Sequence, residues 1–247
     1  MRVAVVTGAS GVLGRATARA LAIAGATVCL VGRKQEALEA AVAEINVAAA
    51  APSSQPAALP IVCDVTDEAE VMRLFADATK AAGAPPDLLV NCVGIMSGGA
   101  TVDMTAATFD NVMKVNVMGT YICCREAFKV MSKAGGGRII NIGSLAARSP
   151  RANSAAYTTS KFALDGLTRS LALDGRPLNI AVGIIHPGNV ESELIPPEER
   201  KRRRKEEGYI AAEDVAASVL HMASLPLSAN VLEMTVLPSQ QPFVGRG

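Results

Sequence analysis

The alternation of short apolar runs with longer helical patterns is the feature of this 247-residue chain that most restricts its fold. Seven runs read as strands, near residues 2–6, 27–31, 59–63, 87–91, 137–142, 179–185 and 231–236. The helical patterns lie near 13–24, 34–49, 67–82, 105–133, 154–174 and 211–224. Strands that alternate with helices predict βαβ units and a parallel sheet. We therefore expect a doubly wound α/β/α fold in one domain over 1–247, with ligands beyond the carboxyl ends of the strands.

The composition narrows the class of protein. Half of the residues are hydrophobic, but only 3% are aromatic, so small and branched aliphatic side chains must form the core of this α/β fold. A net charge of +1 gives no global field toward nucleic acid or membrane. The five cysteines show no CxxC motif or metal-ligand spacing, and the sequence shows no signal peptide and no bilayer-spanning apolar stretch. We expect a cytoplasmic protein with reduced thiols and without a metal.

A glycine-rich segment, Thr-Gly-Ala-Ser-Gly-Val-Leu-Gly, follows the first predicted strand and opens the first helix. Glycines let a backbone turn tightly and approach a pyrophosphate, whose charge then faces the free N–H groups of the helix N-terminus. The position in the first βα turn favours nucleotide binding over a purely structural turn. The predicted contacts from this loop are Thr7, Gly8, Ser10, Gly11, Leu13 and Gly14.

Arg33 and Lys34 follow the second predicted strand, where an NAD-binding protein usually has an acidic residue for the ribose 2′-OH. A basic pair there offers a charge-assisted grip on a 2′-phosphate, so we predict NADP(H) in preference to NAD(H). The alternative is a solvent-facing pair at a helix start. Asp64, after the third strand, is expected to accept the adenine amino group or to cap the next helix, although Thr66 or Asp67 is better placed as a cap.

Tyr157 and Lys161 lie four residues apart and share one face of a predicted helix. A tyrosine ordinarily ionises near pH 10 (roughly), and an adjacent ammonium favours the phenolate. Such a pair can exchange a proton with a hydroxyl or carbonyl group of a substrate. A solvated helix face without chemistry remains the alternative for this spacing.

The pair is part of a larger ordered set. Ser144 lies thirteen residues before Tyr157 at the end of the fifth strand, and Asn116 lies in Lys-Val-Asn-Val-Met-Gly. Together with the glycine loop, this set resembles the single-domain branch of the short-chain dehydrogenase/reductase family, which has a Rossmann fold. The resemblance implies that Tyr157 exchanges a proton with a carbonyl, and that Lys161 favours the ionised tyrosine and holds the nicotinamide ribose. It also implies that Ser144 orients the reacting oxygen, and that Asn116 holds a water linking Lys161 to solvent.

The resemblance adds cofactor contacts at the ends of other strands. The segment 91–94, Asn-Cys-Val-Gly, is similar to the family's stretch beside the adenine ribose, and 187–192 is similar to its stretch at the nicotinamide carboxamide. The contacts implied in this way are Val65, Asn91, Gly94, Tyr157, Lys161, Pro187, Gly188, Val190 and Ser192.

Three positions depart from the pattern of this branch. Val12 occupies the position of the middle glycine, so that Gly11 gives the spacing of the longer, extended members. Cys92 replaces an asparagine that supports the sheet, and Ser192 replaces a threonine but keeps the hydroxyl. We expect local variation in pyrophosphate packing and a rerouted hydrogen bond near Cys92.

Residues 191–208 fall where the family has a short substrate lid. Within it, 198–207 holds six bases and four acids, with the basic residues at 200–205. This run predicts either a solvated helix with internal ion pairs or a surface that attracts an anionic, carrier-bound or CoA-bound acyl substrate. His186 is expected to be a packing residue or to line the nicotinamide pocket, and His221 an ordinary surface or core residue.

These patterns predict an NADP(H)-preferring oxidoreductase that interconverts a carbonyl (a ketone, aldehyde or 3-oxoacyl group) and a secondary alcohol. By resemblance we expect a homotetramer or homodimer that uses the helices near 105–133 and 154–174. Two alternatives are open: a non-catalytic NADP(H)-sensing or scaffolding relative, and a dehydratase or epimerase on the same scaffold.

Overall fold

A computed structural model describes residues 2–52, 56–192, 195 and 197–244 and contains one seven-stranded parallel sheet. The strands are β1 (Val3–Thr7), β2 (Thr27–Gly32), β3 (Ala58–Val62), β4 (Leu88–Asn91), β5 (Gly137–Ile142), β6 (Ile180–Pro187) and β7 (Glu233–Val236). Their order is β3-β2-β1-β4-β5-β6-β7. The predicted doubly wound sheet is confirmed, and each predicted strand boundary lies within two residues of the observed one.

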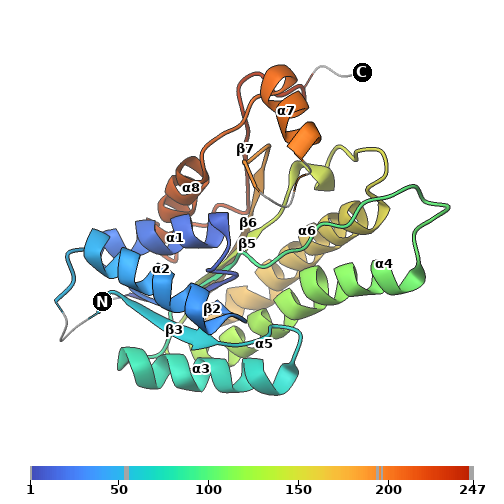
Figure 1. The fold of residues 1–247 in the computed structure, drawn as a ribbon. Coiled ribbons are helices and arrows are strands. Elements are labelled where there is room, and N and C mark those ends of the chain that lie inside the picture. Colours follow the sequence, from blue (N-terminus) through green and yellow to red (C-terminus); the bar gives the residue numbers. More distant parts are fainter. Residues whose placement is uncertain (1, 53–55, 193–194, 196, 245–247) are drawn as a thin grey trace.

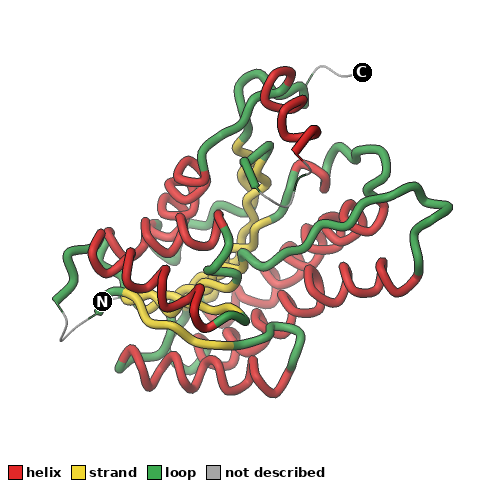
Figure 2. Tube along the Cα trace, viewed as in Figure 1, coloured by secondary structure: helices red, strands yellow, loops and turns green. Residues whose placement is uncertain are grey.

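Helices cover both faces of this sheet (Figures 1 and 2). They are α1 (Val12–Ile23), α2 (Gln35–Ala48), α3 (Glu68–Ala82), α4 (Ala106–Met113), α5 (Thr120–Met131), α6 (Ala155–Gly175), α7 (Pro197–Glu206) and α8 (Ala212–Ser224). Three short segments complete the set, the π-helical η1 (Lys114–Gly119) and the 3₁₀ turns η2 (Leu145–Ala147) and η3 (Arg176–Leu178). Helices α1, α2 and α8 pack on one face, and α3, α5 and α6 pack on the other.

Strand alternation divides the interior into two cores. Along β1, Ala4 and Val6 face α1, α2 and α8, whereas Val5 faces α3 and α5. All three side chains are completely buried, because both faces of a parallel sheet are covered by helices. Helices therefore cover both faces of the sheet interior, and a site is expected at the carboxyl edge of the strands.

The helix boundaries follow recognisable signals. Asp67 caps α3 by accepting a hydrogen bond from the backbone N–H of Glu70 at 2.9 Å, and Gly83 ends the helix in the left-handed conformation, with φ 73°. Asp67, not Asp64, is therefore the cap. The single helix expected near 105–133 is interrupted by η1, where the Thr120 hydroxyl donates to the carbonyl of Asn116 at 2.9 Å.

The connectivity reverses direction between β1 and β4, which are neighbours in the sheet although two strands separate them in the sequence. Thr7 and Asn91 are paired at the carboxyl ends of these strands. Doubly wound sheets bind ligands at such a reversal. Among the helices in the described ranges, none combines the length and apolar character needed to cross a bilayer.

Candidate active site

Helix α6 places Tyr157 and Lys161 one turn apart beside the end of β5. The Lys161 Nζ lies 5.6 Å from the centre of the tyrosine ring and donates a hydrogen bond to the Ile142 carbonyl at 2.9 Å. Lys161 is only 4% exposed, whereas Tyr157 is half-buried. The ammonium is thus fixed between the sheet and the phenol, and the phenol keeps access to solvent or a ligand.

Asn116 lies in η1, and its side chain is directed at the loop after β4. Its Oδ1 accepts from the Ile95 amide at 2.8 Å, and its Nδ2 donates to the Ile95 carbonyl at 2.9 Å and to Ser160 Oγ at 3.0 Å. Gly94 separates Asn116 from Lys161: a Cβ at Gly94 would lie 3.7 Å from both the amide Oδ1 and the ammonium. The wide π-helical turn therefore brings Asn116 next to Lys161, as π-bulges often do at functional sites.

Ser144 follows β5 directly and caps the short turn η2. Its Oγ accepts a hydrogen bond from the backbone N–H of Ala146 at 3.1 Å. A hydroxyl that accepts in this way keeps its own proton available for donation. Because Ile142, two residues earlier, holds Lys161, the serine and the lysine are anchored to the same strand end.

The glycine-rich loop forms a tight cradle between β1 and α1. A Cβ at Gly14 would lie 2.3 Å from the carbonyl oxygen of Gly8, and one at Gly8, where φ is 66°, would lie 2.9 Å from the amide of Val93. Gly11 caps α1 without a side-chain hydrogen bond, which leaves the helix N-terminus to other acceptors. Such a cradle fits a pyrophosphate. Val12, at the family's glycine position, is 49% exposed.

The end predicted to bind adenine combines exposed bases with an acid. Arg33 and Lys34 are exposed at the end of β2. Asp64 accepts hydrogen bonds from the amide and hydroxyl of Thr66 at 2.9 and 2.8 Å. Desolvation opposes ionisation of Asp64, but these bonds and the charge of Arg33 hold its pKa below the ordinary value. Val65 is buried against Gly119, at the end of η1.

Two predicted cofactor contacts use their side chains inside the protein instead. Thr7 Oγ1 donates to Asn91 Oδ1 at 3.4 Å, Asn91 Nδ2 donates to Asn141 Oδ1 at 2.9 Å, and Asn141 Nδ2 donates to Thr168 Oγ1 at 2.9 Å. This polar ladder joins β1, β4, β5 and α6, and all four side chains are buried. Any contact that Thr7 or Asn91 makes with a cofactor would therefore come from the backbone.

The segment after β6 is held by a network that the sequence did not suggest. The side-chain Nδ2 of Asn189 donates to Glu207 Oε2 at 2.9 Å, and the backbone N–H of Asn189 donates to Gln241 Oε1 at 2.8 Å. Arg151 contacts both carboxylate oxygens of Glu207, at 2.7 and 3.3 Å. We call Arg151, Asn189, Glu207 and Gln241 the lid network. It joins the loop before α6, the loop after β6, the end of α7 and the C-terminal segment.

Four of the predicted contacts lie in or beside this segment. A Cβ at Gly188 would lie 2.3 Å from Gln241 Oε1, so the chain after Pro187 passes close against the C-terminal segment. Val190 forms an isolated parallel bridge with Ile210, and the Ser192 carbonyl accepts from the amide of Ile195 at 3.3 Å. The part of the expected lid at 193, 194 and 196 lies outside the described residues.

Helix α7 carries the charge run, and three of its bases form ion pairs. Arg202 contacts Glu199 at 2.8 Å and Glu206 at 2.6 Å, and Arg203 contacts Glu199 at 2.6 Å. Arg204 pairs with Glu191. The interpretation as a solvated helix with internal pairs is the one that these contacts support.

All five cysteines are free thiols. Burial raises the pKa of Cys92 to about 12 and that of Cys29 to about 11. These thiols are therefore neutral and poor nucleophiles at neutral pH.

Comparison with known proteins agrees with this geometry. A family model described as short chain dehydrogenase matches residues 2–203, which include the glycine-rich loop, Asn116, Ser144, Tyr157 and Lys161. A short-chain type dehydrogenase/reductase of Picea abies is 38% identical over 198 residues, 78% of this chain and 72% of the relative.

Two further proteins extend the comparison. The chloroplastic NADPH-dependent aldehyde reductase 2 of Arabidopsis thaliana is 31% identical over 201 residues, 78% of this chain and 74% of the relative. Among solved structures, a variant of actinorhodin polyketide ketoreductase with NADPH superimposes with a TM-score of 0.87 at 27% identity, over 96% of this chain and 95% of that one.

Proposed function

The chain belongs to the short-chain dehydrogenase/reductase family of NAD(P)-dependent oxidoreductases, and from this premise we propose that it interconverts a carbonyl and a secondary alcohol with NADP(H) and with Tyr157 as general acid/base. The observation that carries the proposal is the position of Lys161. Its buried ammonium is held by the Ile142 carbonyl against the face of a solvent-accessible phenol. A cation in this position stabilises the negative charge that develops on the phenol oxygen while it exchanges a proton with the substrate.

Each residue of the set has a proposed part in the reaction. The nicotinamide, when bound, supplies or accepts the hydride. In reduction, Tyr157 donates its proton to the carbonyl oxygen. Ser144 donates its hydroxyl hydrogen to the same oxygen, a contact that strengthens as negative charge develops there. Asn116 holds the loop at Ile95 and, with a bound water, links Lys161 to the solvent, so that the proton is replaced after each turnover.

NADP(H) preference rests on Arg33 and Lys34. Their exposed side chains at the end of β2 suit a 2′-phosphate, for which guanidinium and ammonium groups are good partners. The glycine cradle would hold the pyrophosphate, Asp64 the adenine amino group, and Lys161 the nicotinamide ribose. The NADPH-dependent aldehyde reductase and the ketoreductase with NADPH noted above support this choice.

We also propose a homodimer or homotetramer. Large apolar side chains are exposed on the helices expected to form the interface: Met118 and Tyr121 on η1 and α5, and Phe162 and Leu173 on α6, each 40–57% exposed. A second copy of the same helices would cover them. Light scattering coupled to size exclusion measures this directly, and a monomer of 25.5 kDa would contradict it.

The function is tested by following NADPH absorbance at about 340 nm with a panel of ketones, aldehydes and 3-oxoacyl thioesters. Tyr157→Phe keeps the ring but removes the proton, so we expect kcat to fall roughly 100-fold or more, the usual contribution of a general acid. NADPH binding, followed by fluorescence, should be retained. If the wild type binds NADPH but oxidises it with no substrate of the panel, the sensing or scaffolding alternative is favoured.

A further inference from the structure

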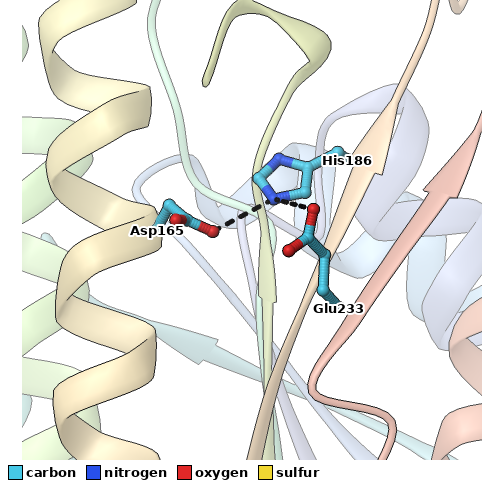
Figure 3. A group of neighbouring side chains, drawn as sticks. All are labelled: Asp165, His186 and Glu233. Atoms are coloured by element: carbon cyan, nitrogen blue, oxygen red, sulfur yellow. Dashed lines mark ion pairs between the residues drawn. The ribbon is translucent and has the colours of Figure 1, made fainter. Parts of the chain in front are cut away.

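His186, at the end of β6, lies between the backbone of Ser144 and a group of charged side chains. Figure 3 shows its ring beside the carboxylates of Asp165 and Glu233. Its ring is completely buried. Nδ1 lies 2.9 Å from the Ser144 carbonyl oxygen and 3.2 Å from the Ser144 amide nitrogen. On the other side, Nε2 lies 3.4 Å from Asp165 Oδ1 and 3.9 Å from Glu233 Oε1.

The close approach to the serine depends on Gly143. A Cβ at this position would lie 2.5 Å from His186 Nδ1 and 2.8 Å from Cε1. Because Gly143 has no side chain, the imidazole reaches the backbone where β5 ends. The histidine is thus in direct contact with the residue whose hydroxyl is proposed to orient the reacting oxygen.

Four charged residues surround the opposite edge of the ring; we call Arg148, Asp165, Arg169 and Glu233 the charge cluster. Arg148 contacts Asp165 at 2.9 Å and Glu233 at 2.8 Å. Arg169 contacts Asp165 at 3.0 Å and Glu233 at 2.5 Å. The cluster is therefore neutral as a whole, and both of its acids face the imidazole.

Both acids are held in the ionised form. Desolvation opposes ionisation of Asp165, but hydrogen bonds from Arg148 and Arg169 outweigh it and keep the pKa of Asp165 below the ordinary value. A hydrogen bond from Arg148 is the main cause that lowers the pKa of Glu233. At neutral pH the Nε2 edge of His186 therefore meets two carboxylates.

This environment discriminates between the two neutral tautomers of the imidazole. A proton on Nε2 points toward the carboxylates, whereas a lone pair on Nε2 would be repelled by them. With the proton on Nε2, Nδ1 has a lone pair and accepts from the Ser144 amide at 3.2 Å. The Ser144 carbonyl oxygen, 2.9 Å from Nδ1, opposes this tautomer, but the two full charges near Nε2 outweigh one carbonyl dipole. Burial is the main cause that lowers the pKa of His186, which favours the neutral ring. Within the described residues Nε2 makes no hydrogen bond, so its contact with Asp165 at 3.4 Å is electrostatic.

We propose that His186 is a positioning residue: the charge cluster holds its imidazole in the Nε2–H tautomer, and Nδ1 in turn holds the backbone amide of Ser144 at the end of β5. Protonation of the ring would replace the Nδ1 lone pair by a donor. The ring would then lose the hydrogen bond from the Ser144 amide and would donate to the Ser144 carbonyl instead. This inference rests on the proposed function, because His186 acts on the reaction only through Ser144.

The alternative to a positioning role is that His186 and the two acids bind a cation. Asp165, His186 and Glu233 offer ligand atoms that all lie within 4.8 Å of one another. However, Arg148 and Arg169 already neutralise both carboxylates, and a divalent cation would be placed beside two guanidinium groups. The electrostatics therefore favour the imidazole tautomer over a metal.

The tautomer is measurable without any enzymatic activity. The chain has two histidines, so a protein labelled with ¹⁵N in the imidazole gives two sets of signals, and His221→Gln assigns them. We expect His186 to be neutral with the proton on Nε2 at about pH 7.5. The double variant Asp165→Asn/Glu233→Gln should shift the population toward Nδ1–H. A proton on Nδ1, an imidazolium, or signals that change on addition of EDTA would overturn the proposal.

Kinetics test the consequence for the reaction. Asn at position 186 keeps an acceptor oxygen near the place of Nδ1, whereas Leu does not. We expect His186→Leu to lower kcat roughly 10- to 100-fold, the usual cost of a small misplacement, with KM for NADPH unchanged. His186→Asn should recover kcat to within about threefold of the wild type. Ile185→Val, on the opposite face of β6, is the buried control and should have no effect.

The pH profile separates positioning from structural support. The kcat of the wild type should fall as His186 becomes protonated on acidification, and His186→Asn should lack this fall. Equal losses of kcat in the Asn and Leu variants, with unchanged pH profiles, would overturn the proposal. If the wild type reduces no carbonyl, the proposed function fails, and the NMR experiment still decides the tautomer.

Discussion

The nucleotide half of the site is shaped mainly by the backbone, whereas its lid half is shaped mainly by side chains. The nucleotide half comprises the glycine-rich loop and the ends of β1, β2 and β4, and its shape depends on glycines such as Gly8 and Gly14, where a Cβ would meet backbone atoms. The lid half comprises the loop after β6, α7 and the C-terminal segment, and its shape depends on the side chains of the lid network.

The difference has a physical consequence. A cradle of backbone atoms presents N–H groups at fixed positions and tolerates no added atoms. A network of side chains can lose one hydrogen bond and keep the rest, and its strength depends on the ionisation of Glu207. We therefore expect the first half to respond to steric change and the second to respond to charge and pH.

Among the variants that compare the two halves, the largest effect is expected from Gly14→Ala. The new Cβ would lie 2.3 Å from the Gly8 carbonyl oxygen, so the loop must shift. Overpacking costs about 1–3 kcal/mol, and we expect NADPH affinity to fall roughly 10- to 100-fold by fluorescence titration. Gly166→Ala on α6, where a Cβ meets no described atom of the same chain within 4 Å, is the matched control, provided that light scattering gives it the wild-type mass. If the affinity of Gly14→Ala for NADPH were unchanged, a role of the glycine cradle in NADPH binding would be contradicted.

Glu207→Gln tests the lid half. We expect a loss of about 1–2 kcal/mol in the free energy of unfolding from chemical denaturation, because the charge-assisted bonds to Arg151 are weakened. Glu206→Gln, an exposed neighbour paired only with Arg202 among the described residues, should change it by less than about 0.5 kcal/mol. Equal effects of the two variants would contradict the distinction.

The same carboxylate predicts a pH dependence. Burial opposes ionisation of Glu207, but hydrogen bonds from Arg151 and Asn189 outweigh it and hold the pKa at about 2, against an ordinary value of 4.5. Because the pKa is lower in the folded protein, the network stabilises the fold fully above pH 4.5. This contribution is lost as the pH falls toward 2, and Glu207→Gln should lose less stability over that window than the wild type.

The smallest effect is expected from Arg33→Ala, an exposed side chain in the half that is otherwise built from backbone. If Arg33 contacts a 2′-phosphate, the affinity for NADPH should fall about fivefold to tenfold while that for NADH stays unchanged. Lys80→Ala, a basic residue in the last turn of α3, is the control. Parallel losses for both cofactors would contradict the NADP(H) preference.

The comparison also explains which features the sequence could predict. The strands and most helices were predicted to within two residues, because a buried parallel sheet and its helices leave regular apolar patterns. The nucleotide half is encoded locally, in the eight residues from Thr7 to Gly14, and Asn116, Ser144, Tyr157 and Lys161 stand in a recognisable order. Their roles remain predictions.

The lid network, the charge cluster and the π-helical turn were not predicted. Arg151 and Glu207 are 56 residues apart in the sequence, and single charged residues at such distances carry no periodic signal. His186 was expected to be a packing residue or a pocket residue, and its contact with Ser144 arises only when β5 and β6 pair. The π-helical turn at η1 depends on the backbone conformation around Asn116, and a pattern of apolar residues does not indicate that conformation.

The ladder from Thr7 through Asn91 and Asn141 to Thr168 has a consequence for motion. Its amide and hydroxyl groups lie where water cannot replace a broken partner, so sliding β1, β4, β5 or α6 past one another would leave polar groups unsatisfied. The span between the dinucleotide cradle and the tyrosine helix is thereby kept constant. We therefore expect any opening and closing during the proposed reaction to involve the lid half, whose segments lie outside this ladder.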